Sequence, residues 1–77
     1  MKVKVLFFGV LTEVAGTDCR FYEEVRSTAD LEHRVMDDYP EIGHYTYRIS
    51  LNSEITDESR ALDDGDEVAF LPPFAGG

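Results

Sequence analysis

The chain has 77 residues, 43% of them hydrophobic, and its 16 acidic and 7 basic residues give it a net charge of −9. This length allows one domain with one small core. Such a domain has little room for a deep cavity that could enclose a complete active site. The negative charge argues against nucleic acids and anionic membranes as partners, and no segment reaches the length of a membrane span.

The first elements predicted along the chain are two strands with a short helical turn between them. The first strand covers residues 2–8, and one of its faces carries Val3, Val5 and Phe7. A helical turn at residues 11–15 ends at Gly16, which suits a left-handed helix cap. Residues 19–25 form the second strand, and we expect it to pair with the first strand as a wide hairpin.

A longer helix follows the hairpin. Ser27 and Asp30 form a weak capping box at its start, and the helix runs to about Asp38. Its apolar stripe consists of Leu31, Val35 and Tyr39, with Met36 at the edge. Pro40 ends the helix, and a linker at residues 42–44 leads to the next strand.

Three further strands complete the predicted elements. Residues 45–51 alternate as a strand, and the side chains on one of its sides are Tyr45, Tyr47, Ile49 and Leu51. Asn52 and Ser53 form a turn that leaves residues 54–56 as a very short strand. The turn at residues 63–66 is rich in aspartate and glycine, and it precedes the last strand at residues 67–71.

This order of elements predicts an α+β fold of the β-grasp, or ubiquitin-like, type. One main helix crosses one face of a mixed sheet in residues 1–71, and residues 72–77 form an extended, flexible tail. If the first and last strands are neighbours, the apolar side chains on the open face of the sheet are Leu6, Phe8, Ala69 and Leu71. This open-face patch is either a docking surface or a modest exposed remainder of the sheet, and its position beside the tail favours docking.

The chain closes with two prolines and a diglycine, in the run Leu71-Pro72-Pro73-Phe74-Ala75-Gly76-Gly77. The prolines cannot continue a strand ladder and hold the chain extended, while the glycines carry no side chain that would obstruct a narrow channel. At roughly 3.3 Å per residue, the tail reaches about 20 Å, which is long enough to enter the active site of another protein. The alternative is a frayed terminus in which glycines are tolerated because nothing packs there.

Acidic residues are concentrated ahead of the last strand. Seven of the sixteen lie in residues 54–67, where Arg60 is the only basic residue. Such a segment either keeps the protein in solution or guides a positively charged partner toward it. In the second case the candidate guiding residues are Asp63, Asp64 and Asp66.

Other residue types that carry chemistry do not form a site in this sequence. Cys19, His33 and His44 lack metal-ligand spacing, so no metal is expected. Adjacent carboxylates, such as those of Asp37 and Asp38, point in different directions and form a poor acid–base pair. No phosphate-binding loop or serine-nucleophile motif is present, so we do not expect an enzyme that acts on its own.

The single cysteine allows no internal disulfide and the initial apolar run is too short for a signal peptide, so we expect a cytoplasmic protein.

Two stretches resemble the small subunit of molybdopterin synthase, the MoaD family. They are KVKVLFFG at residues 2–9 with EVAG at residues 13–16, and LDDGDEVAFLPPFAGG at residues 62–77. The resemblance spans essentially the whole domain, and the middle segments match by pattern more than by identity. The related thiamine-pathway carriers (ThiS) share the fold and the diglycine but usually lack the insertion at residues 11–16, which favours MoaD. Phe74 departs from the family pattern, where a smaller aliphatic residue is expected.

The resemblance implies that the carboxylate of Gly77 carries sulfur. A ubiquitin-activating-type (MoeB-like) adenylyltransferase would use ATP to adenylate it, and a sulfurtransferase would convert the adenylate to a thiocarboxylate. The tail would then enter the MoaE-like large subunit of molybdopterin synthase, where the sulfur passes to a pyranopterin precursor of the molybdenum cofactor. The chain itself would bind no cofactor. The tail residues that enter are Gly76, Ala75, Phe74, Pro73 and Pro72, and the residues that contact partners are Phe8, Leu6, Leu71, Ala69, Asp63, Asp64 and Asp66.

Other functions use the same features. A ubiquitin-like modifier would join Gly77 to a target lysine through an isopeptide bond, whereas a plain interaction domain would leave the terminus inert. A ThiS-like carrier serving thiamine or another thiolation pathway is an alternative within sulfur chemistry. Any carrier of this kind needs an activation step, because a carboxylate is anionic and a poor electrophile at neutral pH.

Overall fold

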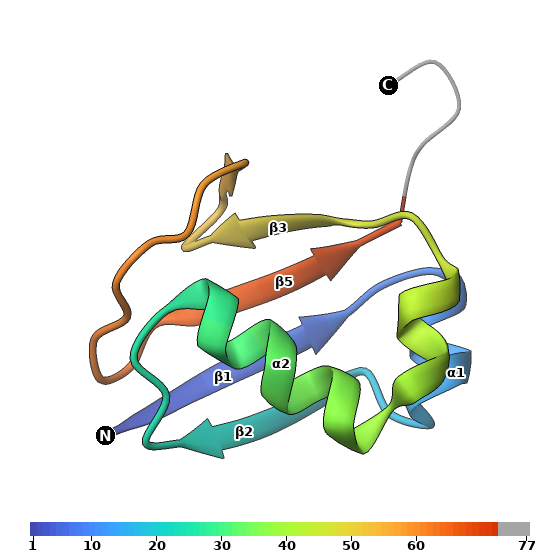
Figure 1. The fold of residues 1–77 in the computed structure, drawn as a ribbon, viewed down its shortest axis with the longest axis horizontal. Coiled ribbons are helices and arrows are strands. Elements are labelled where there is room, and N and C mark those ends of the chain that lie inside the picture. Colours follow the sequence, from blue (N-terminus) through green and yellow to red (C-terminus); the bar gives the residue numbers. More distant parts are fainter. Residues whose placement is uncertain (73–77) are drawn as a thin grey trace.

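The computed structural model describes residues 1–72 of the chain, which form five strands, two α-helices and one 3-10 helix (Figure 1). In chain order these are β1 (Lys2–Phe7), α1 (Val10–Ala15), β2 (Cys19–Glu23), α2 (Thr28–Asp38), the 3-10 helix η1 (Pro40–His44), β3 (Arg48–Leu51), β4 (Glu54–Thr56) and β5 (Glu67–Leu71). The strands build a mixed sheet in the order β2-β1-β5-β3-β4.

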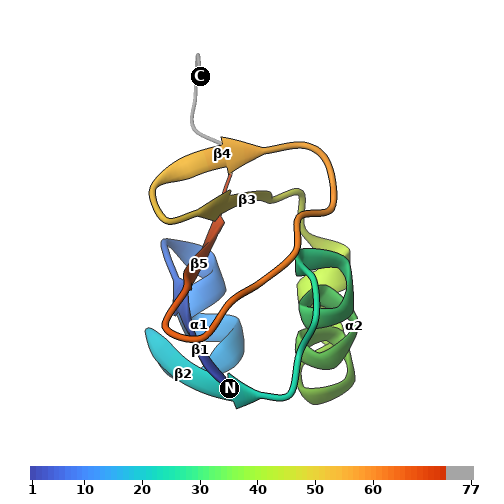
Figure 2. The same cartoon turned by 90° about the vertical axis from the view of Figure 1, so that its left-hand side faces the viewer.

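The first and last strands meet at the centre of this sheet. β1 and β5 are parallel neighbours, with Val5 opposite Val68 and Phe7 opposite Phe70. β2 runs antiparallel to β1 on one side, while β3 runs antiparallel to β5 and to β4 on the other. α2 covers one face of the sheet (Figure 2). This arrangement confirms the predicted β-grasp fold.

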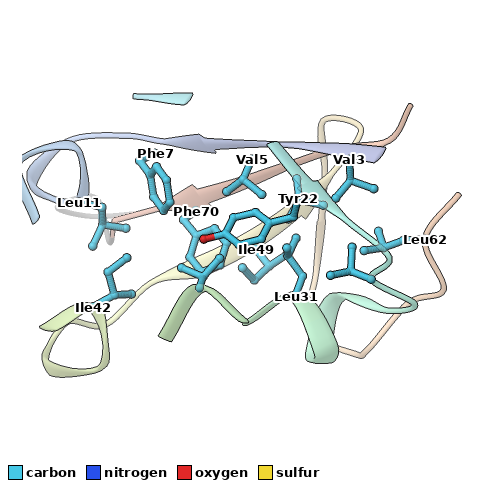
Figure 3. Packing of buried hydrophobic residues seen from close by; sticks show 13 residues of the cluster. Val3, Val5, Phe7, Leu11, Tyr22, Leu31, Ile42, Ile49, Leu62 and Phe70 are labelled. Carbon is cyan, nitrogen blue, oxygen red and sulfur yellow. The ribbon is translucent and has the colours of Figure 1, made fainter. Parts of the chain in front are cut away.

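Alternating residues of the two central strands form the core under α2, as predicted. Four of these side chains are 0% exposed and Phe7 is 1% exposed. The four are Val3, Val5, Val68 and Phe70. The rings of Phe7 and Phe70 lie side by side, with their centroids 5.6 Å apart (Figure 3). Leu31 and Val35 of α2 are fully buried against them, so the predicted helix stripe faces the sheet.

One end of the core is closed by Leu11 of α1 and Ile42 of η1, which are both 0% exposed (Figure 3). The prediction of a linker at residues 42–44 is therefore wrong, because these residues belong to a helical turn with a core side chain. Pro40 occupies the first turn of η1, where its fixed φ and missing N–H are tolerated. Burial of Ile42 gives this short turn a stabilising contact that a linker would lack.

Three predicted strands are shorter in the structure, and β1 ends at Phe7, one residue before its predicted end. β2 ends at Glu23, and Glu24 then adopts a left-handed conformation with φ of 57°, which breaks the ladder before residue 25. β3 begins at Arg48, so the strand predicted from residue 45 starts three residues later. Tyr45 does not join the core, being 39% exposed, and its N–H donates to the carbonyl of Ile42 at 3.1 Å.

Both predicted helix caps are present. The hydroxyl oxygen of Ser27 accepts the N–H of Asp30 at 3.1 Å and starts α2. Gly16 has a left-handed φ of 73°, and its N–H donates to the carbonyl of Thr12 at 2.9 Å, which ends α1.

Two tyrosines, one on β2 and one directly before β3, connect α2 to the sheet. The hydroxyl of Tyr22 on β2 donates to Oδ2 of Asp38 at 2.7 Å, and the hydroxyl of Tyr47 donates to Oε1 of Glu32 at 2.7 Å. Burial, reinforced by the hydrogen bond to a carboxylate, raises the pKa of both tyrosines above the ordinary value. Both hydroxyls therefore keep their donor proton at neutral pH, and the helix is held at two separate points.

The core contact of α2 can be tested with Leu31→Ala. Removing this fully buried side chain should lower the free energy of unfolding by about 2–5 kcal/mol, because it leaves a cavity under the helix. Urea denaturation followed by circular dichroism measures the change. His33→Ala is the control on the exposed side of the same helix, where we expect a change within about 0.5 kcal/mol. Equal effects of the two substitutions would contradict this packing.

Candidate functional site

The candidate site lies where β5 ends and the tail begins. Leu71 is the last residue of β5, and the partly buried Pro72 follows it outside the ladder. The remaining residues predicted to form the tail lie outside the described residues; these are Pro73, Phe74, Ala75, Gly76 and Gly77. The structure therefore describes the surface from which the tail departs.

The open face of the sheet is organised in rows of side chains that cross the strands. The register places Leu6 of β1 opposite Ala69 of β5, and Ala69 opposite Ser50 of β3. At the two edges the same row continues with Cys19 of β2 and Ile55 of β4. Residues opposite each other in adjacent strands share a face, so all five strands contribute to one row.

The next row toward the tail brings Phe8 and Leu71 together. The N–H of Phe8 donates to the carbonyl of Phe70 at 3.3 Å, so the pairing with β5 continues past the end of β1. Leu71 in turn lies opposite Arg48 of β3, whose guanidinium contacts the carboxylate of Asp57 at 2.8 Å. Phe8 and Leu71 are thus neighbours at the base of the tail, as the sequence predicts.

The side chains of the open-face patch differ in how much they offer to a partner. Phe8 is 44% exposed, and Leu6 and Leu71 are partly buried. Ala69 is only 7% exposed, because its small side chain lies in the central strand between larger neighbours. Ala69 therefore forms the floor of the patch, and its contact with a partner stays a prediction.

Two further apolar side chains on the same face are exposed and were not predicted as part of the patch. Phe21 of β2 is 52% exposed and lies opposite Lys4, while Ile55 of β4 is 51% exposed. The exposure of Phe21 could have been predicted from the alternation of residues 19–23, since its neighbour Tyr22 points into the core and alternate residues face opposite sides of a sheet. The apolar surface therefore extends to both edges of the sheet.

A hollow of about 610 Å³ opens beside Phe8, between β1, β2 and the start of α1. Its lining includes Leu6 and Phe8 on the apolar side and Lys4 and Asp18 as charged groups. A hollow of this composition suits an apolar side chain of a docking partner that is flanked by polar groups.

The acidic turn at residues 63–66 lies at the opposite end of β5 from the tail (Figure 1). The carboxylate of Asp66 accepts the N–H of Asp63 at 2.8 Å and the side-chain amide of Asn52 at 3.0 Å. These two hydrogen bonds lower the pKa of Asp66. Asp64 accepts the N–H of Lys2 at 2.7 Å. Two of the three predicted guiding acids therefore also hold the turn in place, and the structure does not bring any of them to the patch.

Cys19, His33 and His44 lie on β2, α2 and η1 respectively. Within residues 1–72, no three side chains of histidine, cysteine, aspartate or glutamate gather so that they could hold a metal ion. In the same part of the chain, no helix combines the length and the apolar character needed to cross a membrane.

A mixed sheet with parallel first and last strands at its centre and one helix across a single face defines a ubiquitin-like β-grasp protein. The sequence matches the ThiS family over residues 5–77, and the chain belongs to this family. This result confirms the resemblance to the MoaD and ThiS carriers seen in residues 2–9, 13–16 and 62–77.

Individual relatives agree with this assignment. The chain is 37% identical over 82 residues to the molybdopterin synthase sulfur carrier subunit of Mycobacterium tuberculosis, covering 100% of this chain and 99% of that protein. A structure of the complex of subunits 1 and 2 of the molybdopterin-converting factor from Helicobacter pylori contains a chain with 26% identity and a TM-score of 0.75, with 100% of both chains covered. The small archaeal modifier protein 1 (SAMP1) of Methanosarcina acetivorans has 25% identity and a TM-score of 0.85, covering 99% of this chain and 96% of that one.

The structural role of Asp66 predicts a pH-dependent effect of Asp66→Asn. Because folding lowers the pKa of this carboxyl, its contribution to stability is fully present above the unfolded value of about 3.9 and is lost as the pH falls through the lower folded value. Asp66→Asn should therefore lower the urea midpoint at pH 7, and the difference from the parent chain should shrink below about pH 4.

Asp63→Asn is the control for Asp66→Asn, since it removes the same charge from the same turn while keeping the Asp63 N–H that donates. We expect a smaller change in the urea midpoint at pH 7. If both variants lost the same stability, net charge rather than the hydrogen bonds of Asp66 would be responsible.

Proposed function

We propose that this chain is a sulfur carrier and the small subunit of a molybdopterin synthase, with the carboxylate of Gly77 as the loading point for sulfur. The observation that carries the proposal is the 37% identity over the full chain with a relative of that name. The structure supports it with an apolar, partly exposed sheet face at the base of the tail.

Loading needs two chemical steps, because a carboxylate at neutral pH is a poor electrophile. In the first step a carboxylate oxygen of Gly77 attacks the α-phosphorus of ATP, and pyrophosphate leaves. In the second step hydrosulfide attacks the acyl carbon, AMP leaves, and loss of a proton leaves the sulfur on the chain as a thiocarboxylate. The thiocarboxylate is then the nucleophile that delivers sulfur to a pyranopterin precursor.

We assign these steps to partner proteins rather than to this chain. A MoeB-like adenylyltransferase would use the ATP, a sulfurtransferase would supply the sulfur, and a MoaE-like large subunit would hold the pterin. The complex of subunits 1 and 2 known from Helicobacter pylori supports a large-subunit partner. In this scheme the chain binds no cofactor and contributes no catalysis of its own, and a cytoplasmic location would give it access to all three partners.

The division between patch and tail suits a carrier that visits several enzymes. Docking through Phe8 and Leu71 would keep the tail at a high effective concentration near each active site, so that one reactive group serves successive steps. The acidic residues would act at a distance by speeding encounter, since the turn at residues 63–66 lies away from the patch.

Docking through the patch is tested with Phe8→Asp. A charge at this 44% exposed position should weaken binding to the large subunit by about tenfold or more, because a buried anchor would be replaced by a desolvated carboxylate. Phe21→Asp is the matched control, a comparably exposed aromatic on the same face but two rows away from the tail. Calorimetry measures both affinities and urea denaturation checks both folds. Equal losses of affinity would place the interface elsewhere.

Sulfur loading is tested by intact-mass measurement after incubation with ATP, the adenylyltransferase and a sulfur source. The parent chain should gain about 16 Da, the difference between sulfur and oxygen, and deletion of Gly77 should abolish the gain without changing the fold. Residues appended after Gly77 should have the same effect as the deletion. A Gly77-deleted chain that still supported sulfur transfer would contradict the proposal.

The structural likeness to SAMP1 favours protein modification as a second candidate function. A modifier would form an isopeptide bond between Gly77 and a lysine amine. The amine of the target protein, rather than a sulfur nucleophile, would then attack the acyl adenylate. The same mass measurement distinguishes the two, because conjugation adds the mass of a whole target.

A further inference from the structure

Gly9 lies against the first residue of the tail. It connects β1 to α1 with φ of 59° and ψ of −136°, a conformation that residues with a side chain rarely adopt. A Cβ atom at this position would come within 2.7 Å of Cγ of Pro72, and within 3.6 and 3.7 Å of the Cβ and Cδ atoms of the same ring. The proline ring therefore occupies the space that a side chain of residue 9 would fill.

The turn that carries Gly9 is held by three hydrogen bonds and by one core side chain. The hydroxyl of Thr12 donates to the carbonyl of Phe7 at 3.0 Å, and the N–H of Thr12 donates to the carbonyl of Gly9 at 3.1 Å. The N–H of Leu11 donates to the carbonyl of Phe8 at 3.2 Å, and the side chain of Leu11 is fully buried in the core. A Cβ at residue 9 could not be relieved by a movement of this turn without disturbing the core.

A side chain at residue 9 would displace Pro72 rather than the turn. Pro72 stands one residue beyond β5, where Leu71 is still registered with Arg48, and it has no N–H to join the ladder. A clash with residue 9 would therefore change the direction of the chain after Leu71 while the strand itself stayed in place.

We propose that Gly9 is a positioning residue for the tail: its missing side chain forms a seat for Pro72 and fixes the direction in which the reactive end leaves the sheet. This inference rests on the proposed function for the tail. Five further residues span at most about 17 Å, so a change of about 20° at Pro72 moves an extended end by about 6 Å. Displacements of this size are large compared with the precision that a reacting atom needs.

The test compares Gly9→Ala with Gly16→Ala in the adenylation step, measured as pyrophosphate release with the adenylyltransferase and ATP. Gly16 also has positive φ and caps the other end of α1, but a Cβ there meets no atom within 4 Å. Gly9→Ala should lower kcat at least tenfold more than Gly16→Ala, with KM for the carrier changed less than about threefold because Phe8 and Leu71 keep their side chains. Urea midpoints measured for both variants account for any loss of folded protein.

Pro72→Ala separates the clash from backbone strain. It removes Cγ, the ring atom that would lie 2.7 Å from a Cβ of residue 9, while the strain of an alanine at residue 9 remains. The double variant Gly9→Ala/Pro72→Ala should therefore recover to within about threefold of Pro72→Ala alone. If the two substitutions lower kcat independently, or if Gly9→Ala behaves like Gly16→Ala, the seat does not exist.

A structural measurement keeps this test independent of sulfur chemistry. In the parent chain, nuclear Overhauser effects should connect the α protons of Gly9 with the ring protons of Pro72. The absence of these nuclear Overhauser effects would overturn the role of Gly9. If Gly9→Ala fails to fold, this measurement on the parent chain still tests the contact between Gly9 and Pro72. A parent chain that shows them but releases no pyrophosphate would count against the proposed function instead.

Discussion

The parallel pairing of β1 with β5 is the constraint on which the rest of the structure depends. It joins residues that lie more than sixty positions apart in the sequence, and its ladder extends from the hydrogen bond between Lys4 and Asp66 to that between Phe8 and Phe70. This pairing sets Phe7 against Phe70 in the core and places Phe8 beside Leu71 on the opposite face. The base of the tail is thus a product of long-range strand pairing, although the tail belongs to one end of the chain.

The same two strands serve stability and recognition through alternate residues. The odd-numbered residues of β1 and the even-numbered residues of β5 are buried under α2, while the residues between them face away from the helix. A substitution such as one at Phe8 can therefore alter a surface without opening a cavity. The separation is incomplete at Ala69, which faces away from the helix and is nevertheless covered by its neighbours.

Much of this architecture follows from local patterns in the sequence. Strand alternation, the cap at Ser27 and the cap at Gly16 define elements through nearest neighbours, and all three were predicted correctly. The error at residues 42–44 concerns a state that depends on tertiary contacts, because burial of Ile42 turns the predicted linker into η1. The structural role of Asp66 was not predicted either, since its hydrogen bond to Asn52 joins residues 14 positions apart. The contact between Gly9 and Pro72 belongs to the same class, since neither residue has a local pattern that points to the other.

The direction of β1 also decides where further protein can be attached. Lys2 pairs with Asp64 and Gly65 at the far end of the sheet from Leu71 (Figure 1). Five residues of strand, about 16 Å, therefore separate the amino end of the sheet from the base of the tail. An affinity tag or a fused enzyme joined ahead of Met1 would emerge at the far end of the sheet from Leu71 and Pro72, whereas an addition after Gly77 would block the proposed loading point.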